Sequence, residues 1–191
     1  IAPALIAGNT VILKHAAQTL KVGEHLAEAF QAAGIPHDVF QNVVLSHDVT
    51  SKLISERMFN FVNFTGSVAG GKAMEQAAAG TFTAISTELG GKDPGYVRED
   101  ANIDAAVATL VDGAMFNSGQ CCCGIERIYV HKSRYAEFVK KAVGMVNTYK
   151  LGNPLDPETT LAPMANMRFA NEDRAQIKEP VDAGAKAHIK T

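Results

Sequence analysis

Three consecutive cysteines, Cys121, Cys122 and Cys123, are the residues of this 191-residue chain best suited to covalent chemistry, and the sequence has no others. A cysteine acts as a nucleophile through its thiolate, which forms more readily where backbone N–H groups or positive charges lower the pKa of the thiol. The Ser-Gly-Gln sequence before them (residues 118–120) is typical of a turn after a helix, where a thiol can be partly exposed. One of the three is therefore a candidate nucleophile, and a packed cluster of inert thiols is the alternative.

A metal site and a disulfide scaffold are weaker interpretations of the same cysteines. Adjacent side chains are expected to diverge, and no Cys-x-x-Cys or His-x-x-x-His spacing elsewhere supplies further zinc ligands. Three clustered thiols also fit a reducing compartment better than a secreted disulfide framework, whose cysteines would be spread along the chain. We therefore expect no metal and a cytoplasmic location.

A glycine-rich stretch, residues 64–71 with the sequence Phe-Thr-Gly-Ser-Val-Ala-Gly-Gly, follows a predicted strand and opens a predicted helix. The unpaired N–H groups and the dipole of a helix N-terminus attract phosphate groups. The spacing differs from the dinucleotide fingerprint Gly-x-Gly-x-x-Gly. A nucleotide site and a simple glycine turn therefore both remain open.

Two charged residues stand at the ends of predicted strands. Glu88 is followed by Leu-Gly-Gly (residues 89–91), where the backbone can approach a ligand closely, so Glu88 is either a general base or a solvated carboxylate. Lys14 either binds ribose hydroxyls or extends its ammonium group into water. Spacing alone decides neither case.

An α/β fold must position these residues, because apolar β-branched runs alternate with segments of helical periodicity. Strands are predicted at residues 11–14, 39–45, 58–64, 83–88, 95–98 and 125–131. Helices are predicted at residues 19–33, 49–56, 72–79, 102–116, 134–149 with Ser133 as N-cap, and 166–183, where Pro180 would kink or end the helix. The short connections indicate βαβ units and a mostly parallel sheet. The turn-forming residues 89–95 mark a candidate domain boundary.

The composition is that of an ordinary globular chain, with 47% hydrophobic and 20% charged residues. Its 18 basic and 20 acidic residues give a net charge of −2, without the basic run that would follow a phosphate backbone. No apolar stretch approaches the roughly 20 residues that span a bilayer. We expect neither nucleic acid nor a membrane as a partner.

Four short sequences together resemble the aldehyde dehydrogenase superfamily, in the family's order and along nearly the whole chain. They lie within residues 2–14 (Ala-Pro-Ala-Leu, then Asn-Thr-Val-Ile-Leu-Lys), 64–67 (Phe-Thr-Gly-Ser), 88–92 (Glu-Leu-Gly-Gly-Lys) and 119–122 (Gly-Gln-Cys-Cys). The resemblance implies mostly parallel sheets with flanking helices. Residues 1–88 would be part of a Rossmann-like NAD(P)-binding domain, and residues 89–191 part of the catalytic domain that carries the nucleophile.

The same resemblance implies roles for individual residues. In the family pattern Gly-Gln-x-Cys the nucleophile is the cysteine two residues after the glutamine, which selects Cys122, and Glu88 matches the general base. Ser67 matches the pyrophosphate contact and Lys14 the ribose contact. The complete set of implied cofactor-binding residues is Lys14, Thr65, Gly66, Ser67, Gly71, Leu89 and Gly90.

The activity implied by the resemblance is oxidation of a small-molecule aldehyde to a carboxylate with NAD or NADP. A thiolate at Cys122 attacks the aldehyde, hydride passes to nicotinamide, and water deprotonated by Glu88 hydrolyses the thioester. A CoA-acylating semialdehyde dehydrogenase would release the thioester to CoA, which the presence of Glu88 disfavours. Outside the enzyme class, the alternative is an inactive, truncated binding or structural form of the fold.

Two sequence features bear on the cofactor and the substrate. Most of the family has a glutamate that holds the adenosine ribose three residues after the lysine, and this chain has Ala17 there. The Lys-His-Ala run at residues 14–16 is similar to that of some succinate-semialdehyde dehydrogenases. Because family members are much longer, we expect an internal portion of a longer enzyme that forms a homo-oligomer.

Overall fold

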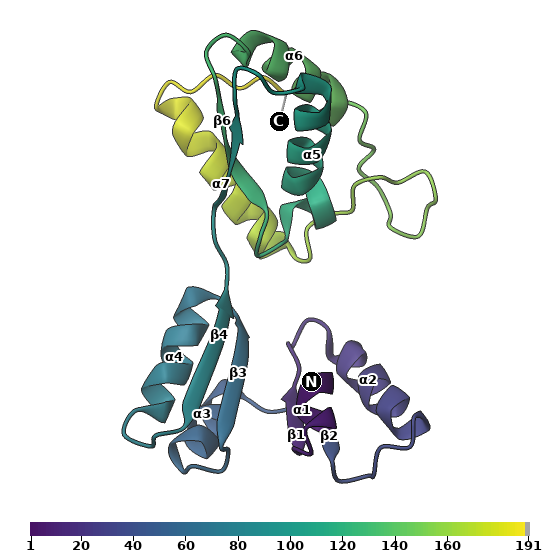
Figure 1. The fold of residues 1–191 in the computed structure, drawn as a ribbon, viewed down its shortest axis with the longest axis vertical. Coiled ribbons are helices and arrows are strands. Elements are labelled where there is room, and N and C mark those ends of the chain that lie inside the picture. Colours follow the sequence, from purple (N-terminus) through teal and green to yellow (C-terminus); the bar gives the residue numbers. More distant parts are fainter. Residues whose placement is uncertain (190–191) are drawn as a thin grey trace. The chain divides into compact units, whose positions relative to one another are not determined.

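The computed structural model describes residues 1–189, and the chain divides into two compact units, Ile1–Glu88 and Leu89–Thr191 (Figure 1). The elements up to the boundary are α1 (Ala2–Ile6), β1 (Val11–Lys14), α2 (Leu20–Ala32), β2 (Phe40–Val43), α3 (His47–Ser55), β3 (Phe61–Gly66), α4 (Val68–Ala78) and β4 (Ala84–Leu89). The later elements are β5 (Asp93–Val97), α5 (Ile103–Met115), the 3-10 helix η1 (Phe116–Gly119), β6 (Ile125–Val130), α6 (Tyr135–Val146) and α7 (Met167–Asp182). The roles of the two units as cofactor-binding and catalytic parts stay predictions.

The predicted alternation of strands and helices is confirmed, and the fold is α/β with parallel strand pairs and flanking helices. In the described residues the strands form three two-stranded sheets, β1-β2, β3-β4 and β5-β6. Helix α2 contacts β2, where the rings of Phe30 and Phe40 lie 4.8 Å apart between centroids. None of the helices within residues 1–189 has the length and apolarity to cross a membrane.

A small apolar core in the first unit joins α3, α4, β3 and β4. Its buried side chains are Ile54, Met74 and Ala78, and partly buried residues including Phe64 pack against them. Helix α4 begins at Val68, four residues earlier than predicted, because the Ser67 side chain caps it. The glycine-rich stretch therefore runs from the end of β3 through the cap at Ser67 into the first turn of α4.

The second unit is built on the parallel pair β5-β6, with α5 in contact with both strands and with α6 (Figure 1). Its core consists of the buried residues Val97, Ile103, Val107, Val111 and Phe138. Because α5 ends at Met115 and β6 begins at Ile125, this core fixes both flanks of the segment that carries the cysteines.

Three local predictions differ from the structure. Strand β5 begins at Asp93, so its first residues, including Pro94, fall within residues 89–95, which were predicted to form a turn. A two-stranded sheet accommodates proline because each strand has an open edge, where no backbone N–H is needed. The N-cap of α6 is Arg134 and not Ser133. The hydroxyl of Ser133 instead forms a hydrogen bond with His131 Nδ1 at 2.8 Å. Pro180 lies within the last turn of α7, which continues to Asp182.

Two helix glycines, at matching positions near the C-termini of α5 and α6, offer a test of the packing. A Cβ atom at Gly113 would lie 2.6 Å from Ile125 Cδ1 and 3.2 Å from its Cγ1, whereas a Cβ atom at Gly144 would meet nothing within 4 Å. We predict that Gly144→Ala raises the free energy of unfolding by about 0.5–1 kcal/mol, the helix preference for alanine.

Gly113→Ala has the same helix preference, but crowding against Ile125 is expected to cost about 1–3 kcal/mol and to cancel the gain or reverse it. Denaturant unfolding of the two variants in parallel measures the difference. Equal stabilisation by both alanines would mean that α5 does not approach the start of β6 this closely.

Candidate active site

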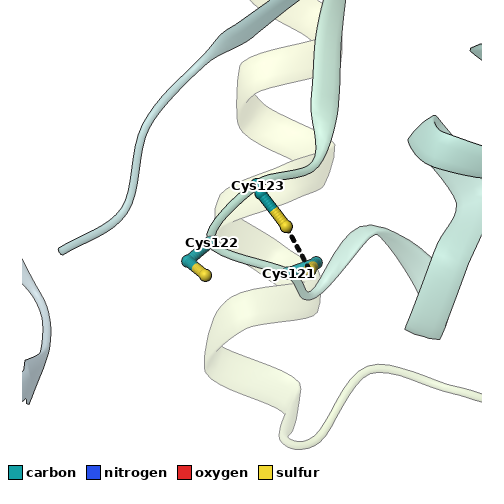
Figure 2. Close-up of side chains that lie close together, drawn as sticks. All are labelled: Cys121, Cys122 and Cys123. Carbon is teal, nitrogen blue, oxygen red and sulfur yellow. Dashed lines mark hydrogen bonds between the residues drawn. The ribbon is translucent and has the colours of Figure 1, made fainter. Parts of the chain in front are cut away.

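The three cysteines lie on a tight turn between η1 and β6 (Figure 2). The N–H of Gly124 donates to the carbonyl oxygen of Cys121 at 3.2 Å, which places Cys122 and Cys123 at the two corner positions of the turn. The three Sγ atoms all lie within 4.8 Å of one another. The expectation that neighbouring cysteine side chains diverge is therefore wrong, because the turn folds them together.

Two of the thiols contact each other. The Sγ atoms of Cys121 and Cys123 are 3.4 Å apart and share a hydrogen bond, drawn as the dashed line in Figure 2. The backbone N–H of Cys123, followed by its thiol, lowers the pKa of Cys121, while the hydrogen bond to Cys121 raises the pKa of Cys123. Cys122 is exposed and lies outside this pair.

A metal ion would meet an incomplete set of ligands at this turn. The group of candidate ligand atoms consists of the three thiols, and no histidine, aspartate or glutamate of residues 1–189 joins it. Structural zinc sites are closed by four protein ligands. The absence of a resident metal stays a prediction.

The backbone before the cysteines is left-handed over three successive residues. Asn117, Ser118 and Gly119 have φ values of 50°, 60° and 75°. Glycine adopts this conformation freely and asparagine tolerates it, but it is unfavourable for serine. Two local bonds hold the arrangement: Asn117 Nδ2 donates to the carbonyl of Gln120 at 3.0 Å, and Gln120 Nε2 donates to the carbonyl of Asn117 at 3.2 Å.

Two hydrogen bonds tie the same segment to a part of the chain far away in the sequence. Gln120 Oε1 accepts the N–H of Ala165 at 2.8 Å, and Ser118 Oγ donates to the carbonyl of Ala162 at 2.6 Å. In the sequence, Ser118 and Gln120 stood out only as parts of a turn and a motif, without a role for their side chains. No local pattern could have found these bonds, because the partners are 45 and 44 residues away.

Gly91, the second glycine of the Leu-Gly-Gly sequence after Glu88, also lies close to the cysteine turn. A Cβ atom at Gly91 would lie 3.8 Å from the carbonyl oxygen of Cys122, so the backbone of Gly91 comes close to the turn. Lys92, next in sequence, forms an ion pair with Glu126 across the β5-β6 pair. Glu88 is exposed and is the last residue of the first unit, so its proposed partnership with Cys122 stays a prediction.

The residues expected to bind pyrophosphate surround the start of α4. Thr65 and Gly66 end β3, and Ser67 Oγ accepts the N–H of Gly70 at 3.1 Å. Gly71 is buried, and its N–H already donates to the carbonyl of Ser67 at 2.9 Å, so it would contribute packing space rather than a donor.

The first two N–H groups of α4, those of Val68 and Ala69, have no acceptor within the helix, since the first N–H groups of any α-helix lack one. These two donors were not among the cofactor contacts predicted from the sequence. Both Gly66 and Gly70 leave room for the Phe64 ring, since a Cβ atom on either would lie 2.6 Å from Phe64 Cζ. The two glycines therefore accommodate the Phe64 ring, and the N–H groups of Val68 and Ala69 are the feature of this helix start that favours a phosphate group.

The remaining candidate cofactor residues stand at strand ends. Lys14 is half-buried at the end of β1, beside Val43 at the end of the parallel strand β2. Leu89 ends β4 and Gly90 follows it, exposed to solvent. Ligands commonly bind at the carboxyl ends of parallel strands, which is where Lys14 lies.

Comparison with known proteins gives a consistent result. The sequence profile described as "Aldehyde dehydrogenase family" matches residues 1–191. A curated relative named "Succinate-semialdehyde dehydrogenase NADP(+)", from Mycobacterium leprae (strain TN), is 37% identical over 186 residues, which are 97% of this chain and 40% of that protein. The chain thus spans about 40% of the length of the curated relatives that it matches.

Solved structures with the same fold agree. The structure of 3,6-anhydro-L-galactose dehydrogenase in complex with NAP superimposes with a TM-score of 0.92 at 34% identity, covering 98% of this chain and 39% of that one. The crystal structure of lactaldehyde dehydrogenase from Escherichia coli gives a TM-score of 0.93 at 32% identity, covering 98% of this chain and 40% of that one. The cysteine turn, the α/β architecture and these matches together establish that the chain belongs to the aldehyde dehydrogenase family.

Proposed function

We propose that this chain is part of an enzyme that oxidises an aldehyde to a carboxylate with NAD or NADP, and that Cys122 is its nucleophile. The observation that carries the proposal is the turn on which Cys122 stands exposed, outside the hydrogen-bonded pair formed by Cys121 and Cys123. The match of the family profile to the whole chain supports the reaction class.

The residues of this chain would divide the reaction between them. The Cys122 thiolate adds to the aldehyde carbon, and its own backbone N–H would stabilise the oxyanion that forms. A nicotinamide cofactor, when bound, supplies the hydride acceptor that turns the adduct into a thioester. Glu88 deprotonates the water that hydrolyses the thioester and frees Cys122 for the next turnover.

The start of α4 supports the cofactor assignment. Ser67 Oγ already accepts a hydrogen bond from Gly70, so its hydroxyl proton remains available to a phosphate oxygen. The N–H groups of Val68 and Ala69 add two donors at the positive end of an 11-residue helix. Gly71, Thr65 and Gly66 shape the backbone around them, and Lys14, Leu89 and Gly90 complete the set of proposed cofactor contacts.

The substrate class follows from the relatives rather than from a pocket. The curated relatives named above and several others are called succinate-semialdehyde dehydrogenases of the NADP(+) type, so a small semialdehyde and NADP are the first candidates. We further expect a cytoplasmic homo-oligomer that binds neither a membrane nor nucleic acid. Neither a CoA-acylating enzyme nor an inactive form is favoured by an observation on this chain, which has both Cys122 and Glu88.

The nucleophile assignment is tested by comparing three alanine variants of the enzyme that contains this chain. Cys122→Ala should lower aldehyde-dependent NAD(P)H formation by on the order of 10⁴-fold or more, because the covalent intermediate can no longer form. Cys121→Ala and Cys123→Ala, the matched controls on the same turn, should keep much of the activity. A comparable loss in Cys121→Ala would refute the assignment of the nucleophile to Cys122.

The role of Gln120 as a positioning residue gives a second prediction. Gln120→Ala removes both side-chain bonds, whereas Gln120→Glu keeps an acceptor for the Ala165 N–H. We expect kcat to fall by about 10²-fold in Gln120→Ala, since a misplacement of about 1 Å at the nucleophile costs that much, and to fall less in Gln120→Glu.

Thermal unfolding measured alongside separates positioning from general destabilisation. A control, Ser133→Ala, removes one exposed bond to His131 elsewhere in the same unit and should leave kcat unchanged. If Gln120→Ala retained full kcat, the bond to Ala165 would have no part in placing the cysteine turn.

The third prediction concerns cofactor choice at Ala17, which is exposed just after β1. No carboxylate stands there to repel the 2′-phosphate of NADP, so both cofactors should be accepted. Ala17→Glu should raise the ratio of kcat/KM for NAD over NADP by roughly tenfold or more, the effect of about 1.4 kcal/mol of repulsion. Ala17→Gln, which has the same shape without the charge, should shift the ratio much less; equal shifts would rule out charge as the cause.

A further inference from the structure

We propose that Cys121 and Cys123 form a reversible disulfide with a peroxide as the oxidant, while Cys122 between them stays a free thiol. The inference rests on the proposed function for its effect on activity. The bond itself depends only on the geometry of the turn and can be tested without any turnover assay.

The geometry of the turn favours this pair. The two Sγ atoms are 3.4 Å apart, and a disulfide needs about 2.05 Å, so the side chains must approach by little more than an ångström. The hydrogen bond from Gly124 to the Cys121 carbonyl already holds the backbone in a turn, which removes most of the entropy cost of closing the loop. Cys123 is exposed and Cys121 partly exposed, so a small oxidant can reach both.

The hydrogen bonds also give the two thiols different roles. Cys121 accepts from the backbone N–H and the thiol of Cys123, which lowers its pKa, and the thiol of Cys122 adds a smaller effect in the same direction. Desolvation and, more weakly, the charge of Asp93 oppose this shift. The same contact raises the pKa of Cys123 and keeps it protonated. Cys121 is therefore the thiolate that reacts with the oxidant, and Cys123 is the thiol that resolves the product.

The atoms balance in two steps. Cys121 attacks one oxygen of hydrogen peroxide; the O–O bond breaks, the sulfur becomes a sulfenic acid, and one water leaves. Cys123 then attacks that sulfur; the S–O bond breaks, the S–S bond forms, and a second water leaves. Two thiols lose two hydrogens in total, and one peroxide becomes two waters. A dithiol reductant restores the starting thiols by exchange.

The disulfide would affect the nucleophile without consuming it. Closing the pair changes the turn on which Cys122 stands and redirects its Sγ and its backbone N–H, the proposed oxyanion donor. Because a displacement of about 1 Å at a reacting group can cost on the order of 10²-fold in rate, the oxidised enzyme should lose about that much activity. Reduction by dithiothreitol should restore it.

Mass spectrometry of the oxidised enzyme tests the pairing directly. After mild treatment with hydrogen peroxide and blocking with N-ethylmaleimide, trypsin releases residues 99–127 as one peptide with all three cysteines, since arginine occupies positions 98 and 127 and no lysine or arginine lies between. We expect this peptide to lack two hydrogens and to carry a single maleimide, located on Cys122 by fragmentation. Maleimide on Cys121 or Cys123 would overturn the proposal, and so would oxygen addition without a disulfide or a disulfide between chains.

Serine variants separate this inference from the proposed function. Cys122→Ser should still form the disulfide on peroxide treatment, and Cys121→Ser or Cys123→Ser should not. If Cys122→Ser is inactive and its peptide shows no disulfide, the inference fails and the proposed nucleophile stands. If the disulfide forms but Cys122→Ser retains activity, the nucleophile assignment fails and the disulfide stands. Cys123→Ser should also lose the reversible inactivation seen with mild peroxide, and retention of that inactivation would count against the disulfide as its cause.

Discussion

The hydrogen-bonded turn from Asn117 to Gly124 is the constraint on which the rest of the candidate site depends. Left-handed backbone costs about 1–2 kcal/mol at Ser118 and less at Asn117, because asparagine tolerates this conformation. Four side-chain hydrogen bonds, two between Asn117 and Gln120 and one each to Ala162 and Ala165, contribute about 0.5–1.5 kcal/mol each. The four bonds together offset the backbone strain, and the margin is small enough that the turn is sensitive to the loss of any one bond.

The elements on both sides of the turn fix its position. The close contact of Gly113 with Ile125 brings the end of α5 against the start of β6, which fixes the two points between which the turn must run. Gly91 adds a third point, because its backbone approaches the Cys122 carbonyl from the start of β5. A short segment fixed at its ends has few alternative paths, so the core of the second unit positions the proposed nucleophile through the backbone of the turn.

Local sequence patterns predicted the elements well and the site only in part. Strands such as β1 and β6 were predictable because β-branched runs are a local signal, and α2 and α5 because apolar residues recur at helical spacing. The early start of α4 was missed because the Ser67 cap outweighs the low helix preference of the glycines that follow. The bonds of Ser118 and Gln120 to Ala162 and Ala165 join residues more than forty positions apart, and no window of sequence contains both partners.

The shifted pKa values at the turn first suggest Cys121 as the nucleophile, because its pKa is the one that falls. The cause of the lowered pKa argues against Cys121 as the nucleophile. The shift arises mainly because the backbone N–H and the thiol of Cys123 donate to Cys121, so the Cys121 thiol is already bonded to its neighbour. Under the proposed function, Cys122, which is exposed and lies outside this contact, is the thiol that attacks a carbonyl carbon. The contact that joins Cys121 to Cys123 is also the one on which the proposed disulfide depends, so the two proposals assign a nucleophile and a redox pair to three consecutive residues.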